Sequence, residues 1–175
     1  RLRHQYVYLT DSFDPTNTEG AELPAGTAYP NNLIIASYMS DMRNRFSFEF
    51  MTRSGEFWNG TRLNLDGNIA YRFQPKGSVG IDFSVNQIRL PNPYNDANFF
   101  LIGPKFDFTF TRNLFWTTFI QYNNQIDNLN VNSRFQWRFK PVSDLFLVYT
   151  DNYYPSSFSV KSRALVFKLT YWLNV

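Results

Sequence analysis

The sequence has no cysteine and only one histidine, His4, in 175 residues. The lack of cysteine excludes disulfide bonds and thiolate zinc sites, and a single histidine argues against a histidine-based metal site or a Ser-His-Asp triad. No stretch approaches 18 consecutive apolar residues, which excludes a transmembrane helix. We therefore expect no catalytic residues, no metal and no cofactor, and we expect that the chain is not an enzyme.

Charge is also scarce. Charged residues make up 18% of the chain, below the usual quarter, and the net charge of +3 is too small and too scattered to suggest nucleic acid as a partner. Aromatic residues, in contrast, make up 19%, which excludes intrinsic disorder. The chain does not begin with Met and carries no signal peptide, so we expect a processed chain or part of a longer one. Residues 1–175 are expected to form a single domain.

The dominant pattern is a strict alternation of apolar and polar residues. Phe46, Phe48 and Phe50, for example, alternate with Ser47 and Glu49. Such a period of two indicates β-strands, and no segment shows a helical period. The pattern predicts ten strands, at 1–13, 31–42, 45–54, 61–73, 78–90, 99–111, 114–124, 129–140, 144–153 and 161–174.

These strands and their connections predict a membrane barrel. Most are about 10 residues or longer, the length that a tilted strand needs to cross a bilayer, and about twice that of ordinary globular strands. Short turns at 42–44, 74–77, 112–113 and 141–143 alternate with mostly longer loops at 14–30, 55–60, 91–98, 125–128 and 154–160. This alternation is typical of an up-and-down antiparallel barrel of the outer membrane. Ten strands could close alone or form the C-terminal part of a larger barrel.

The apolar face is expected to contact lipid. Its rows of Phe, Tyr, Trp and Leu would overfill the interior of a small soluble barrel, which is the alternative fold. The polar face is rich in Asn, Ser, Thr and Gln, which suits a lumen. Aromatic residues also gather near the strand ends, as an interfacial girdle would require. The predicted girdle comprises Phe57, Trp58, Tyr71, Phe73, Trp116, Tyr122, Trp137, Tyr153, Tyr171 and Trp172.

Thirteen charged residues fall on the predicted inward face. They are Arg45, Glu49, Arg53, Arg62, Asp66, Arg72, Asp82, Lys105, Asp107, Arg134, Arg138, Lys140 and Lys168. They could make the lumen favour anions, as rings of Arg and Lys do. The favoured interpretation is an ion-pair network that fills the barrel, because buried charges must be paired. Glu49 and Asp66 are surrounded by arginines, so a salt-bridge cluster explains them better than an acid-base pair, and His4 is expected at the opposite, periplasmic end.

Two loops and the last strand complete the interpretation. Phe57 and Trp58, in the loop at 55–60, are expected to anchor the rim at the lipid interface rather than bind a ligand. The longest loop, Asp14–Pro30, is expected to be the mobile or partner-binding element. The final strand carries alternating apolar residues up to Val175, a pattern that suits both insertion machinery and plain membrane packing.

The stretch 132–152, which reads NSRFQWRFKPVSDLFLVYTDN, resembles the C-terminal barrel of a Bacteroidota family. In that family a carbohydrate-binding, family-nine-like domain precedes an outer-membrane barrel of unknown function. Val142 stands here where glycine is common, and the loop at 55–60 and the run 121–123 look similar too. The resemblance covers most of the chain and implies the C-terminal part of a longer protein. It transfers no glycan-binding or catalytic residue to this sequence.

These observations lead to one expected location and two expected functions. We expect a barrel in the outer membrane of a Gram-negative bacterium, with membrane lipid and other outer-membrane proteins as partners. The first hypothesis is a membrane anchor or a transport or channel component, linked to glycan handling. The alternative is a non-catalytic subunit or client of a larger outer-membrane assembly, which pairs through an open sheet edge.

Overall fold

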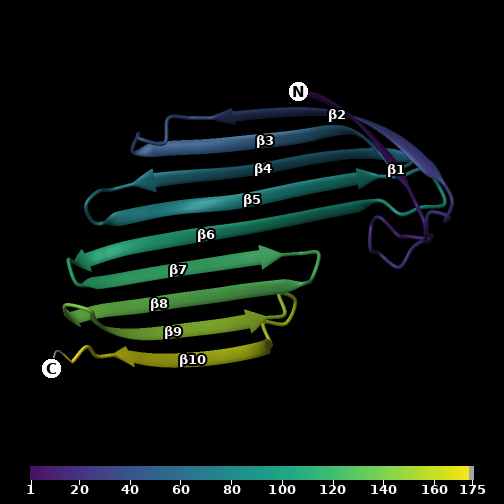
Figure 1. Ribbon diagram of the computed structural model, residues 1–175. Coiled ribbons are helices and arrows are strands. Elements are labelled where there is room, and N and C mark those ends of the chain that lie inside the picture. The colour runs from purple at the N-terminus through teal and green to yellow at the C-terminus, as the bar shows by residue number, and fades with distance from the viewer. Residues whose placement is uncertain (174–175) are drawn as a thin grey trace. The chain divides into compact units, whose positions relative to one another are not determined.

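The computed structural model describes residues 1–173, which form one antiparallel β-sheet. The ten strands lie side by side in chain order, as Figure 1 shows. Their bounds are β1 Leu2–Tyr8, β2 Ala28–Met39, β3 Phe46–Phe57, β4 Gly60–Arg72, β5 Gly77–Arg89, β6 Ala97–Thr111, β7 Leu114–Asn123, β8 Asn128–Lys140, β9 Ser143–Tyr153 and β10 Val160–Thr170.

The sheet is up-and-down and open. Strands β1 and β10 are its two edges, and within residues 1–173 they do not pair with each other. The prediction of ten antiparallel strands in meander order is therefore confirmed, whereas the sheet of residues 1–173 is not closed into a barrel. No helix in the described part of the chain is long and apolar enough to cross a membrane.

Most predicted strands agree with the structure to within three residues at each end. The first strand is an exception, because it ends at Tyr8 rather than at residue 13. The loop predicted at 55–60 is a two-residue turn, Trp58–Asn59, with Trp58 at a positive φ of 55°. The last strand ends at Thr170, and the predicted strand end at 174 and the apolar-face position of Val175 lie outside the described residues.

The chain divides into two compact units. The first contains residues 1–40, 49–67 and 84–100, and the second contains 41–48, 68–83 and 101–173 of the described chain. In each unit, the register confirms the alternation of two faces. In the first, Arg53 pairs with Ile35 and Phe50 pairs with Tyr38. In the second, Arg134 pairs with Thr117 and Phe135 pairs with Trp116.

The two faces differ in what they expose. We call the face that carries Arg53 or Arg134 the polar face and the opposite one the apolar face. On the apolar face of β10, Leu165, Phe167 and Leu169 are 67%, 63% and 56% exposed. Large apolar side chains on a sheet normally lie against a second layer, and none of the described residues covers this row.

The longest loop, between β1 and β2, is folded against the first unit. Thr16 and Leu23 are fully buried, and Phe13 forms a short bridge with Leu23. Asp14 organises the turn, because its carboxylate accepts hydrogen bonds from the backbone N–H groups of Thr16 and Thr18 at 2.8 and 2.9 Å. The expected partner-binding loop therefore has a small core of its own.

A second local core lies where β5 and β6 meet. Ile88, Leu90 and Ala97 are buried there, and Phe57 and Phe99 pack against them.

Close backbone approach also shapes the turn before β5. A Cβ on Gly77, whose φ is 154°, would collide with the carbonyl oxygen of Asp107, so this position requires glycine.

Candidate functional site

The polar face of the first unit carries a hydrogen-bonded charge network. Nη1 of Arg53 lies 3.6 Å from Oδ2 of Asp66 and donates a hydrogen bond to Asn64 at 3.2 Å. The hydroxyl of Ser84 donates to Oδ1 of Asp66 at 2.6 Å. One ion pair and two hydrogen bonds thus connect Arg53, Asn64, Asp66 and Ser84.

Other predicted charges have neutral partners. The guanidinium of Arg62 lies over the ring of Phe57, 4.5 Å from its centroid. Asn68 donates to Asp82 at 2.5 Å, and Arg72 donates to the carbonyl oxygen of Met42. The side chains of Glu49 and Arg45 make no ion pair within residues 1–173. The thirteen charges therefore do not form one continuous network.

In the second unit, each polar-face carboxylate of β6–β10 has a cationic partner. Lys105 lies 3.3 Å from Asp107, which also accepts a hydrogen bond from Thr117 at 2.9 Å. Arg138 lies 3.3 Å from Asp144.

Arg134 and Lys168 are the other two predicted charges on the polar face of β6–β10. Neither makes an ion pair within the described part of the chain. These pairings leave two positive charges in excess on the polar face of β6–β10.

Lys140 does not follow the strand alternation on which its predicted inward position was based. A bulge between Arg138 and Lys140 shifts the register of β8, so Lys140 no longer follows the alternation of that strand. Its ammonium group lies 5.2 Å from the ring centroid of Tyr171 and donates to the Tyr171 hydroxyl at 3.2 Å.

Uncharged side chains form a ladder on the polar face of β8–β10. Asn130 donates to Asn152 at 2.8 Å, and Asn132 donates to Thr150 at 2.8 Å. Asn152 in turn donates to Ser162 at 2.8 Å. We call these five residues the amide ladder. It lies toward the longer loops, and the cations Arg134 and Lys168 lie farther along the strands.

The structure brings part of the predicted aromatic girdle together. On the apolar face near the short turns, Trp116 stacks on Phe108 with ring centroids 5.5 Å apart, and Phe73 lies 5.6 Å from Phe108. Tyr171 stacks on Phe139 at 6.3 Å, and Phe139 lies 5.8 Å from Trp137. Tyr71 and Trp172 are exposed.

Four predicted girdle residues near the longer loops lie in different surroundings. Phe57 packs against the buried Ile88 cluster on the polar face, opposite the face that was predicted to contact lipid. Trp58 contacts Phe13 and Tyr29 of the first unit, at centroid distances of 5.8 and 5.5 Å. Tyr153 lies in β9, where its hydroxyl accepts a hydrogen bond from Arg163 at 3.4 Å. Tyr122 pairs with Leu129 in the β7–β8 register.

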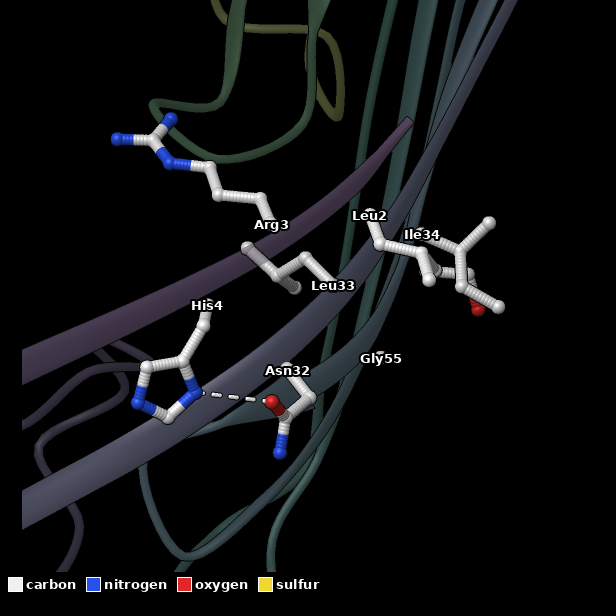
Figure 2. Close-up of a pocket in the computed structure, with 8 residues that line it drawn as sticks. Leu2, Arg3, His4, Asn32, Leu33, Ile34 and Gly55 are labelled. Atoms are coloured by element: carbon white, nitrogen blue, oxygen red, sulfur yellow. Dashed lines mark hydrogen bonds between the residues drawn. The ribbon is translucent and has the colours of Figure 1, made fainter.

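A hydrogen-bonded relay that the sequence did not predict connects His4, Asn32 and Glu56. Nδ1 of His4 is 2.9 Å from Oδ1 of Asn32, and Nδ2 of Asn32 donates to Glu56 at 2.8 Å. Because an amide oxygen only accepts, Nδ1 carries the proton, and Nε2 makes no hydrogen bond with the described residues. Figure 2 shows the imidazole beside Asn32. Both residues line a depression of about 580 Å³, together with Leu2, Ile34 and Gly55.

Within residues 1–173, no hydroxyl group donates a hydrogen bond to His4. The relay also lies beside the first half of β2, near the long loop, and not at the opposite end as predicted. The reason is the shortness of β1, whose His4 pairs with Asn32 only a few residues after that loop.

A second unpredicted cluster lies on the apolar face of β9 and β10. Asp151 is fully buried, and its Oδ2 lies 2.7 Å from Nη2 of Arg163. The Tyr149 hydroxyl donates to the same carboxylate at 2.5 Å. The sequence held a signal for this cluster, because Asp151 and Arg163 both interrupt apolar rows at matching positions of neighbouring strands.

Comparison with protein-family models, curated proteins and solved structures finds no match. Among the described residues, no group of three or more His, Asp or Glu could hold a metal ion. The described residues thus offer hydrogen bonds and charges on a sheet with one apolar and one polar face.

Proposed function

We propose that this sheet is part of an outer-membrane β-barrel that anchors a protein in the membrane or forms a transport component. The observation that carries the proposal is the exposed apolar row of β10, in which Leu165, Phe167 and Leu169 stand on the surface. Monomeric soluble proteins rarely expose contiguous apolar patches beyond a few hundred Å². Contact with lipid removes this surface from water.

The strand lengths support the same proposal. Strands β2–β10 contain 10 to 15 residues, and a tilted strand needs about 9–11 residues to cross the hydrocarbon core. The stacked rings of Trp116 and Phe108 lie near the short turns, where an interfacial aromatic belt would lie. The polar face would line the interior of the barrel.

The open edges require a partner in this setting. In hydrocarbon, every backbone N–H and C=O group must be paired, and β10 offers an unpaired edge within the described residues. On the other side, the described pairing between β1 and β2 ends at Ile34. We propose that further strands of a longer chain, as in the family that 132–152 resembles, complete the barrel.

The second candidate function rests on the same edges. If another protein supplies the missing strands, the chain is a non-catalytic subunit or client in a larger outer-membrane assembly. The role in either case needs no cofactor, and a link to glycan handling follows only from the family resemblance.

Heat-modifiability in detergent tests the proposal. The purified chain is run on a semi-native gel with and without boiling, and in parallel it is reconstituted into phospholipid vesicles and treated with protease. A folded, protected species in vesicles supports the membrane barrel. A faster unboiled band means that the ten strands close alone, and its absence with protection points to an assembly with another chain. A soluble, detergent-free monomer would overturn both functions.

A further inference from the structure

The polar face of β8–β10 carries two cations without a carboxylate partner. Arg134 and Lys168 are both exposed, and the neighbouring carboxylates Asp107 and Asp144 are held by Lys105 and Arg138. Internal ion pairing therefore accounts for the other polar-face charges of β6–β10 and leaves these two available to a ligand.

The register places Arg134 and Lys168 on either side of an apolar floor, which consists of Phe146 and Val148 on β9. Arg134 pairs with Val148, whereas Lys168 pairs with Phe146. Their Cα atoms are thus two strands apart and one same-face position apart, which corresponds to about 12 Å. Phe146 and Val148 lie between them on β9.

The amide ladder borders this floor. Asn132 lies at the next same-face position from Arg134 on β8, and Thr150 follows Val148 in the same way on β9. The Nδ2 group of Asn132 donates to Thr150, which leaves its amide oxygen as an acceptor for a ligand hydroxyl. Gln136 donates to Asp144 and likewise keeps its amide oxygen.

We propose that this surface binds an oligosaccharide that carries carboxylate groups. The guanidinium of Arg134 can hold one carboxylate with two parallel hydrogen bonds, and Lys168 supplies a second positive charge. The ring of Phe146 offers an apolar platform for the C–H face of a sugar, and the free amide oxygens can accept its hydroxyls. The proposal rests on the proposed function, in which this face lines the interior of the barrel.

The two cations, the Phe146 ring and the amide oxygens together favour an acidic oligosaccharide over two simpler classes of ligand. A small inorganic anion would use the cations but neither the ring nor the amides. A neutral oligosaccharide would use the ring and the amides, and it would leave both cations without a partner. An acidic oligosaccharide uses all three.

Calorimetric titration of the full chain in detergent tests the proposal, with trigalacturonate as the probe. Maltotriose serves as the neutral control and sulfate as the inorganic one. We compare Arg134→Gln and Lys168→Gln with Lys76→Gln, which removes an exposed charge in the turn before β5. We expect each of the first two variants to weaken trigalacturonate binding about tenfold, and Lys76→Gln to leave it unchanged.

The possible results distinguish a failure of the acidic-sugar site from a failure of the proposed membrane barrel. Equal binding of maltotriose, equal binding of sulfate, or loss of affinity in Lys76→Gln would each overturn the acidic-sugar site. Insertion of the same preparation into vesicles is measured independently by protease protection. A chain that inserts without binding trigalacturonate refutes the inference alone, whereas a chain that binds it but never inserts refutes the proposed function alone.

Discussion

Substitution of two neighbouring residues in β10 can decide which face of the sheet contacts lipid. Leu165 lies at the centre of Val160–Thr170 on the apolar face and is 67% exposed. Val166 follows it on the polar face and is 53% exposed. We compare Leu165→Arg with Val166→Arg, which share the same strand, the same edge and the same new side chain.

The expected difference follows from the position of Leu165. An arginine on the lipid face of a barrel at mid-bilayer depth costs about 2–4 kcal/mol. That cost lowers the ratio of folded to unfolded protein by about 30- to 700-fold, because 1.4 kcal/mol corresponds to a factor of ten. Val166→Arg adds a charge to a polar surface and should change stability by no more than about 0.5 kcal/mol.

The assay is a urea titration of the chain reconstituted into phosphatidylcholine vesicles, followed by tryptophan fluorescence and protease protection. Leu165→Arg should shift the unfolding midpoint to lower urea, and Val166→Arg should not. Equal midpoints for the two variants, or a larger loss in Val166→Arg, would show that the apolar face does not lie in lipid. In water, an arginine at either exposed position would have little effect.

Three further predictions concern the first loop and one turn. Leu23→Ala should destabilise the folded loop by about 2–5 kcal/mol, measured by urea unfolding, because Leu23 is fully buried and a cavity remains. Burial tends to raise the pKa of Asp14, but hydrogen bonds from Thr16, Thr18 and Gly20 outweigh it and lower that pKa to about 2. Since a lowered pKa stabilises the folded state above the unfolded value of 3.8, amide protection of Thr18 in hydrogen exchange should persist at pH 4 and fall as the pH approaches 2. Gly77→Ala should lower stability by more than about 1 kcal/mol in the same urea assay, because its Cβ would meet the Asp107 carbonyl.

Local alternation was sufficient to predict most of the sheet. Each of the middle strands carries its own pattern of apolar and polar residues, so β4 and β8 could be placed without knowledge of their neighbours. The end of β1 could not be predicted in this way. Beyond Tyr8 the chain turns because Phe13 bridges to Leu23 and Asp14 gathers backbone N–H groups, and these contacts depend on the folded loop.

The polar-face charges were predictable as a set but not as pairs. Arg53 and Asp66 were assigned to one face by alternation, yet their contact depends on the register, which the two-residue Trp58–Asn59 turn helps to fix. Alternation failed at Lys140, where a bulge interrupts β8. Open edges also cannot be derived from alternation, because each strand looks alike whether or not a neighbour follows it.

The ion pair between the buried Asp151 and the exposed Arg163 has a consequence for the edge of the sheet. A slip of β10 by two residues against β9 keeps every side chain on its own face, so the apolar pattern alone does not prevent it. Such a slip would move Arg163 away from Asp151 and leave a buried carboxylate without its cation, which is strongly unfavourable. The pair therefore pins the alignment of the last hairpin. A further strand that pairs with the outer edge of β10 is aligned by backbone hydrogen bonds to β10. Because the Asp151–Arg163 pair fixes the register of β10 against β9, it also sets the register of that further strand.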